Sequence, residues 1–223
     1  MLEINKSQKP RGLVIFDAEG TLFNSEESIF QLWKYIGVVF EKETFLSLEH
    51  YKNIHLRYGS DWNSFAISEF GFKEKDFPKI MEIWKENIVD YYKLYNKFYD
   101  GIIELLLELK EQNYKIAIAT NNCSDAFKDI LHCNNFKEVP MYDEITHIGY
   151  LKPDPSMIID HIIDSGINKT ETWMVGDTMF DIDAGINAGI KTVYADFHLS
   201  GNAEISNNAD YTITNPSELL GLL

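Results

Sequence analysis

Two carboxylates, Asp17 and Glu19, are the first residues of this 223-residue chain whose types and spacing suggest chemistry. They follow the short apolar run of residues 12–15, which has the composition of a buried strand. Ligands of open α/β sheets bind at the carboxyl ends of the strands. An aspartate in that place is a nucleophile, a metal ligand or a helix cap. The last possibility stays open because aspartate is also an ordinary turn residue.

Two later strand-like runs also end in polar residues. Residues 115–119 lead to Thr120 and Asn121, and residues 172–175 lead through a glycine to Asp177. The ends of parallel strands lie along one edge of a sheet, so these side chains are expected to converge with the first carboxylates. This edge is the candidate site.

The residue types at this edge suit the binding of a phosphate and a small cation. Asp17 and Asp177 offer hard oxygens, and Mg²⁺ typically takes one or two carboxylates and keeps several waters. Thr120 can hydrogen-bond a phosphoryl oxygen, and Lys152, in a proline-rich loop, supplies a positive charge. Asp181 follows Asp177 by four residues, which predicts that both lie on one helical face.

The pattern around these residues predicts the elements that position them. Helices are predicted over residues 101–112, 124–133, 156–165 and 180–188, and strands over 115–119, 144–148, 172–175, 191–195 and 211–213. This alternation indicates an α/β fold with a mostly parallel sheet covered on both faces.

The segment between the first strand and this alternation has a different character. Apolar residues recur there at helical spacing, and residues 24–27 are typical of a capped helix start. Residues 24–98 are therefore predicted to be an all-helical subdomain inserted into a core of residues 1–23 and 99–223. The many aromatic residues of this insert are interpreted mainly as packing.

Composition narrows the class of protein. The net charge of −15 argues against binding to nucleic acid, and no apolar stretch is long enough to predict a membrane span. Two cysteines without metal-like spacing and a polar start suggest a reduced, cytoplasmic protein. We expect a monomer or a homodimer.

The four polar segments, in this order and with a helical insert between the first two, resemble the four motifs of the haloacid dehalogenase-like superfamily. The last of them, beginning at Val175-Gly176-Asp177-Thr178, looks especially like phosphoglycolate phosphatase and its relatives. The resemblance implies a Rossmann-like parallel core with a helical cap. It also implies Mg²⁺-dependent hydrolysis of a small phosphorylated metabolite through an aspartyl-phosphate.

The resemblance also implies roles for the carboxylates. Asp17 would attack phosphorus and bind the metal together with Asp177. Glu19 would protonate the leaving oxygen and then activate water, while its backbone carbonyl binds Mg²⁺. Asp181 would support the metal from outside its ligand shell or serve a purely structural role.

Substrate binding is assigned by the same resemblance to Thr120, Asn121 and Lys152, with Lys152 also offsetting the charge of Asp17. Arg57, in the helical insert, is a candidate for substrate recognition because the cap selects substrates in such proteins. Arginine suits bidentate recognition of carboxylate or phosphate, and the alternative for Arg57 is a solvated helix face.

One position departs from the phosphatase pattern, which has Asp where this chain has Glu19. The extra methylene moves the carboxyl group by roughly 1.5 Å, and a misplacement of about 1 Å can cost on the order of a hundredfold in rate. Glu19 therefore leaves two alternatives open, a 2-haloacid dehalogenase-like enzyme and a catalytically weakened member of the superfamily with a binding role. A sugar-phosphate phosphomutase, which would use the same site residues with water excluded by the cap, is the third alternative.

Overall fold

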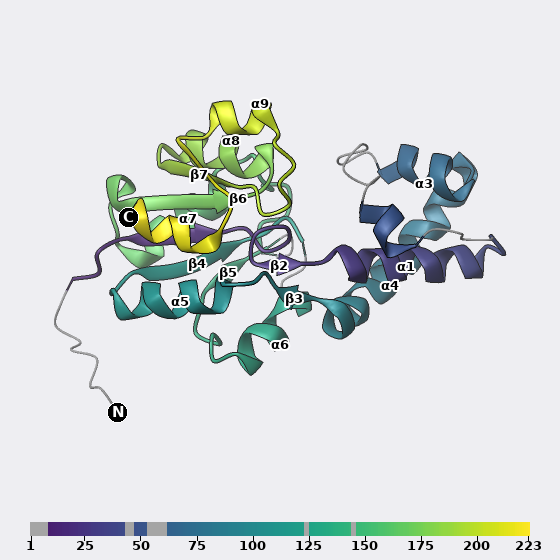
Figure 1. Cartoon of the computed structure of the whole chain (residues 1–223), viewed down its shortest axis with the longest axis horizontal. Helices are drawn as coiled ribbons and strands as arrows, with labels where there is room; N and C mark the ends of the chain where they lie inside the picture. Colours follow the sequence, from purple (N-terminus) through teal and green to yellow (C-terminus); the bar gives the residue numbers. More distant parts are fainter. Residues whose placement is uncertain (1–8, 43–46, 53–61, 123–124, 144–145) are drawn as a thin grey trace. The chain divides into compact units, whose positions relative to one another are not determined.

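The computed structural model in Figure 1 describes residues 9–42, 47–52, 62–122, 125–143 and 146–223. The chain divides into two compact units. One comprises Met1–Phe23, Phe98–Ser124 and His132–Leu223, and the other comprises Asn24–Lys97 and Asp125–Leu131.

A six-stranded parallel sheet forms the centre of the first unit, in the order β5-β4-β1-β6-β7-β8. Its strands are β1 (Leu13–Phe16), β4 (Lys115–Ala119), β5 (Met141–Tyr142), β6 (Thr172–Gly176), β7 (Lys191–Ala195) and β8 (Tyr211–Ile213). The central strands β1 and β6 are buried along their whole length. This burial explains their continuous apolar sequences and confirms the predicted parallel α/β sheet.

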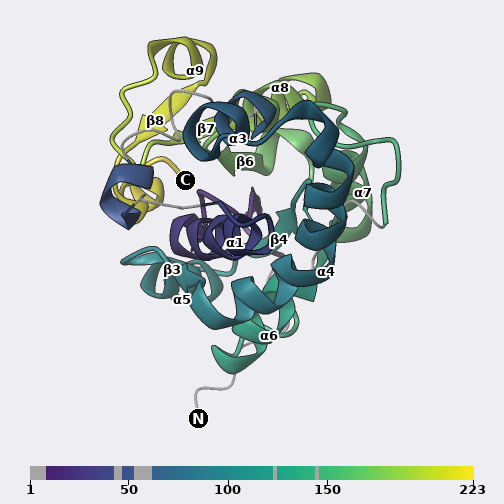
Figure 2. The same cartoon turned by 90° about the vertical axis from the view of Figure 1, so that its right-hand side faces the viewer.

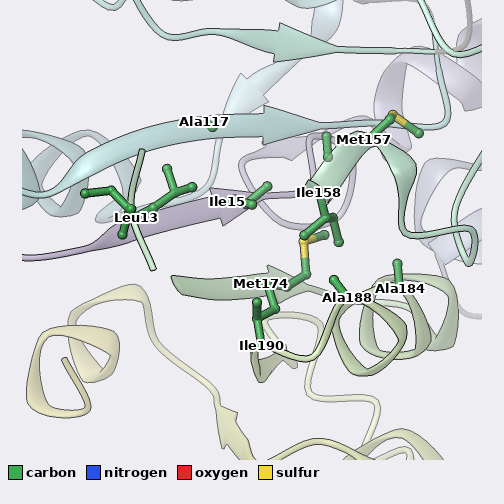
Figure 3. Close-up of a cluster of buried hydrophobic side chains, with 11 residues drawn as sticks. Leu13, Ile15, Ala117, Met157, Ile158, Met174, Ala184, Ala188 and Ile190 are labelled. Atoms are coloured by element: carbon green, nitrogen blue, oxygen red, sulfur yellow. The ribbon is translucent and has the colours of Figure 1, made fainter. Parts of the chain in front are cut away.

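Helices cover both faces of this sheet, as Figure 2 shows for α5 on one side and α7 and α8 on the other. The unit contains α5 (Ile102–Glu111), α7 (Ser156–Ser165), α8 (Met179–Ala188), α9 (Ala203–Asn208) and 3₁₀ helices at Lys169–Glu171 and Pro216–Gly221. Figure 3 shows the core cluster beneath α7 and α8, to which α7 contributes Met157 and Ile158 and the strands contribute Ile15 and Met174. This packing fixes the strands whose ends carry the site.

The strand predicted over residues 144–148 is wrong in position. The strand at this place is β5, a few residues earlier, and the described residues 146–149 form a turn. The Asp143 amide donates to the Thr146 hydroxyl at 2.9 Å, and the Thr146 amide donates to the Asp143 carboxylate at 2.9 Å. Such side-chain contacts with nearby backbone groups compete with a strand ladder and favour a turn.

The second unit is helical in its described part between Glu26 and Tyr95. It contains α1 (Glu26–Val39), α3 (Trp62–Phe70), a 3₁₀ helix (Glu74–Asp76) and α4 (Phe77–Tyr95). The ring of Trp33 lies 5.5 Å from that of Phe70 and 5.3 Å from that of Trp84. These contacts confirm that aromatic residues of the insert serve packing.

Helix α6 (Asp125–Cys133) groups mostly with the helical unit, although the sequence placed it in the core. The Phe127 ring lies 5.5 Å from the Tyr92 ring, and Asp129 pairs with Lys93 at 2.9 Å. The division into core and cap domains stays a prediction.

The chain enters and leaves the helical insert through a two-stranded sheet of β2 (Phe23–Asn24) and β3 (Lys97–Phe98). None of the described helices is both long enough and apolar enough to cross a lipid bilayer.

Candidate active site

Three neighbouring parallel strands end next to one another and bring the candidate residues together. Phe16, at the end of β1, pairs in register with Ile118 of β4 and Val175 of β6. The residue that follows, Asp17, donates its backbone amide to the Val175 carbonyl at 2.9 Å. The first carboxylate is therefore held at the edge where the β4 and β6 loops also begin, as the sequence predicts.

A buried lysine lies between two carboxylates of this edge. The ammonium of Lys152 donates to Asp17 Oδ1 and, at 2.6 Å, to Asp181 Oδ1. Lys152 is 5% exposed and Asp181 1% exposed. Burial alone lowers the pKa of Lys152, but the two carboxylates outweigh burial and leave this pKa raised. Lys152 is thus a cation at any ordinary pH.

Asp181 also caps helix α8. Its Oδ2 accepts from the Thr178 backbone amide at 3.0 Å and from the Thr178 hydroxyl at 2.6 Å. The expected shared helical face is wrong, because Asp177 precedes the capping residue Thr178 and lies outside the helix. Asp181 reaches Lys152 because residue 176 is glycine, where an added Cβ would lie 2.2 Å from the Asp181 Cβ.

Asp177 packs against the loop that follows β1. The Thr21 hydroxyl donates to Asp177 Oδ1 at 3.3 Å. Gly20 has φ +78°, and a Cβ there would lie 2.1 Å from Asp177 Oδ2. Only glycine combines this backbone conformation with the close approach of a carboxylate. The loop therefore places Asp177 beside Asp17.

The carboxylates of Asp17, Asp177 and Asp181 each offer an oxygen, and these atoms lie within 4.8 Å of one another. Burial, with further contributions from the neighbouring carboxylates, raises the pKa of Asp17 to about 7 against the opposing effect of Lys152. Burial and the charge of Asp17 also raise the pKa of Asp177 well above its usual value. The ionised forms of Asp17 and Asp177 are therefore unfavourable when no cation is bound.

The loop after β4 holds the loop that carries Lys152. The Asn121 side chain donates to the Lys152 carbonyl at 2.9 Å, and its oxygen accepts from the Lys152 amide at 2.8 Å. These contacts make Asn121 a residue that positions Lys152, and its predicted contact with substrate stays a prediction. Thr120 is 2% exposed and lines the same pocket, with a hydroxyl hydrogen to donate.

Glu19 also lines this pocket, but it is not one of the three carboxylates that form the cluster found among the described residues. Its Oε2 accepts a hydrogen bond from the side-chain amide of Asn122. The sequence did not single out Asn122, although it directly follows the predicted site residues Thr120 and Asn121. Thr178 was also missed, yet the spacing from Thr178 to Asp181 fits a capping box.

The pocket has a volume of about 220 Å³ and joins all three strand ends. Its lining residues are Asp17, Glu19, Thr120, Asn121, Asn122, Lys152, Thr178, Phe180 and Asp181. Arg57, predicted to contact substrate, lies outside the described residues, so its role stays a prediction.

The fold and the pocket together define a parallel α/β protein with carboxylates, a lysine and a threonine gathered at its strand ends. The chain belongs to the haloacid dehalogenase-like hydrolase family, whose model matches residues 14–195. The protein is therefore an enzyme, and the recognition of its family from the four segments is confirmed.

Proteins from several bacteria resemble the chain over nearly its whole length. It is 27% identical over 216 residues to "Phosphoglycolate phosphatase" of Aquifex aeolicus, covering 95% of this chain and 96% of that one. It is 29% identical over 225 residues to "Pyrophosphatase PpaX" of Bacillus mycoides, covering 94% and 95%.

A solved structure shows the same fold. A haloacid dehalogenase-like family hydrolase from Streptococcus pneumoniae superposes with a TM-score of 0.74 at 20% identity, covering 95% of this chain and 97% of that chain. The similarity confirms the Rossmann-like core with a helical cap.

Proposed function

We propose that the protein is a Mg²⁺-dependent phosphomonoester hydrolase acting on a small phosphorylated metabolite. The observation that carries this proposal is Asp17, a buried carboxylate at a strand end, paired with Lys152 and close to Asp177. The names of the two relatives, a phosphoglycolate phosphatase and a pyrophosphatase, support a small phosphate-bearing substrate.

The donor set suits Mg²⁺. Asp17 and Asp177 supply hard carboxylate oxygens, the ligand type that Mg²⁺ prefers, and Asp181 lies close enough to support them. Three carboxylates against the single ammonium of Lys152 leave two negative charges, which a divalent cation balances. When bound, the cation would neutralise charge on the phosphoryl group.

Asp17 is the nucleophile of the proposed reaction. One oxygen of its carboxylate faces Lys152, and the other attacks phosphorus while the ester P–O bond breaks, giving an aspartyl-phosphate. Glu19 gives its proton to the departing alkoxide oxygen. Glu19 then takes a proton from water, which attacks the same phosphorus, so that phosphate leaves and the Asp17 carboxylate is restored.

Thr120 and Lys152 hold the phosphoryl oxygens during both steps. The hydroxyl donates a hydrogen bond, and the ammonium provides a fixed charge in a place shielded from water. The pocket of about 220 Å³ is smaller than the roughly 300–1,000 Å³ of drug-sized ligand sites. This volume is enough to hold a phosphoryl group with a short substituent.

The proposed function is tested by phosphate release from p-nitrophenyl phosphate, 2-phosphoglycolate and pyrophosphate, each with Mg²⁺ or with EDTA. We expect Mg²⁺-dependent hydrolysis of p-nitrophenyl phosphate and of at least one of the others. Glu19→Gln should lower kcat/KM for 2-phosphoglycolate by about 10²-fold, because an alkoxide needs a proton to leave. The aryl ester should lose much less, since its leaving group is a weak base.

Release of no phosphate from any of the three compounds, with no effect of EDTA, would contradict the proposal and favour a binding role. If Glu19→Gln lowered kcat/KM by the same factor for the alkyl ester and the aryl ester, Glu19 would not be the acid that protonates the leaving group.

The carboxylate cluster also predicts how stability depends on pH in the metal-free protein. The pKa of Asp17 is raised to about 7 and that of Asp177 well above 3.8, so the folded protein keeps protons that the unfolded chain releases. The contribution of these groups to stability is full below about pH 4 and is lost as pH rises through about 7. Asp177→Asn should therefore raise the melting temperature of metal-free protein at pH 8 and change it much less at pH 5.

The same variant tests the cation site. Mg²⁺ at about a hundred times its dissociation constant stabilises by about 2.7 kcal/mol, which is about 5–10 °C for a chain of this size. Asp177→Asn should lose most of that shift in a thermal melt. Burial also lowers the pKa of His161 to about 4, so the contribution of His161 to stability is lost as pH falls. This loss is the same in the wild type and in Asp177→Asn, and it therefore cancels when their melting temperatures are compared. If Mg²⁺ raised the melting temperature of the wild type and of Asp177→Asn equally, the cation would bind at a site that does not include Asp177.

A further inference from the structure

Two consecutive asparagines after β4 face different partners. The side chain of Asn121 is engaged at both ends with the backbone of Lys152. The side-chain amide of Asn122 donates instead to Glu19 Oε2, across 103 residues of sequence. The two residues therefore connect the β4 loop to two different parts of the pocket.

The structure holds the backbone of Asn122 in place. Its amide donates to the Thr120 hydroxyl at 3.1 Å. The Thr120 amide in turn donates to the Tyr142 carbonyl at 3.0 Å, which continues the pairing of β4 with β5. The donor that meets Glu19 is thus anchored to the central sheet.

Glu19 has a fixed backbone and a flexible side chain. Its backbone forms a β-bridge with Phe23, and the neighbouring Ala18 is fully buried. Glutamate has one more rotatable bond than aspartate, so a fixed backbone leaves the carboxyl group of Glu19 less well placed. A hydrogen bond from an anchored amide limits this freedom and holds the carboxyl group in the pocket.

We propose that Asn122 is the positioning residue of Glu19, which makes the longer side chain a competent general acid and base. This inference rests on the proposed phosphatase function. The side chain of Asn122 acts through Glu19, whereas that of Asn121 acts through Lys152. Loss of Asn122 therefore affects the proton transfer to the leaving group, and loss of Asn121 affects phosphate binding for every substrate.

The test measures kcat/KM with Mg²⁺ for an alkyl ester, 2-phosphoglycolate, and an aryl ester, p-nitrophenyl phosphate. Asn122→Ala should lower the value for the alkyl ester by about 10- to 100-fold and that for the aryl ester by less than about threefold. Asn121→Ala should lower both by similar factors. Asn208→Ala is the matched control, since that exposed amide also donates to a single oxygen, the carbonyl of Glu204 on α9.

A second comparison isolates the path through Glu19. In the Glu19→Gln background the proton donor is already absent. Adding Asn122→Ala should therefore change kcat/KM for the alkyl ester and for the aryl ester by less than about twofold each. Thermal melts check that every variant is folded.

Equal losses on both esters in Asn122→Ala would overturn the inference, because they indicate a role in phosphate binding or in folding. A further large loss in the Glu19→Gln background would also overturn it, since Asn122 would then act independently of Glu19. If the wild type hydrolyses neither ester with Mg²⁺, the proposed function fails, and this inference fails with it.

Discussion

Asp17→Asn is expected to reduce phosphate release by at least about four orders of magnitude, below detection in a standard assay. The carboxylate forms the new bond to phosphorus in the proposed reaction, and an amide at that position is not a nucleophile. Removal of a covalent nucleophile typically costs on this scale. Kinetics with p-nitrophenyl phosphate, whose leaving group needs little protonation, keep the contribution of Glu19 as a general acid to this measurement small.

The same variant separates lost chemistry from lost folding. Asparagine has nearly the shape of aspartate but no charge, and Lys152 keeps its contact with Asp181 at 2.6 Å. We therefore expect a folded protein. Asp183→Asn on helix α8 changes the net charge equally and should leave turnover unchanged.

Chemical trapping gives an independent measurement. Borohydride reduces an acyl phosphate to an alcohol, so wild-type enzyme quenched during turnover should carry homoserine at position 17 in a mass spectrum. Appreciable turnover by Asp17→Asn, or trapping at another residue, would show that Asp17 is not the nucleophile.

Lys152→Met is expected to produce the largest loss of stability among single substitutions at the site. Lys152 is 5% exposed and pairs with both Asp17 and Asp181, which are themselves buried. Removal of one partner from a buried ion pair costs about 3–5 kcal/mol, because the remaining charge is left without compensation. Denaturant unfolding of the metal-free protein at pH 8 measures this cost.

The cost should depend on pH and on the cation. The pKa of Asp17 is raised to about 7, so this carboxyl group is largely protonated at pH 5, and the loss in Lys152→Met should be smaller there than at pH 8. Mg²⁺ should recover part of it by binding the same carboxylates. Lys79→Met is the control, since its pair with Glu82 joins two exposed side chains and contributes little. Similar losses in the two variants would contradict a strong role for the buried pair.

Much of the sheet was predictable because its signals are local. The apolar runs at residues 115–119 and 191–195 match β4 and β7 at both ends, and the run at 172–175 falls one residue short of the end of β6. The predicted helix over residues 156–165 also matches α7. The strand near residue 144 was misplaced because β5 is only two residues long and its pairing with β4 decides where it lies.

The candidate site was predictable to the level of residue types and strand ends. The sequence indicated that Asp17, Thr120, Lys152 and Asp177 converge, because parallel strands end at one edge, and the structure gathers these residues there. Their individual roles in catalysis and metal binding stay predictions.

The contacts between the site side chains depend on how the loops pack. Asp181 contacts Lys152 and caps α8 at once, and Asn122 rather than Asn121 contacts Glu19. These partners are distant in sequence, and each contact depends on the direction of a side chain within a loop. Local sequence was therefore enough to identify the family, the sheet and the edge that carries the chemistry. Only the packed loops decided the ion pairs and hydrogen bonds that orient it, because side-chain direction in a loop depends on neighbours that local sequence does not specify.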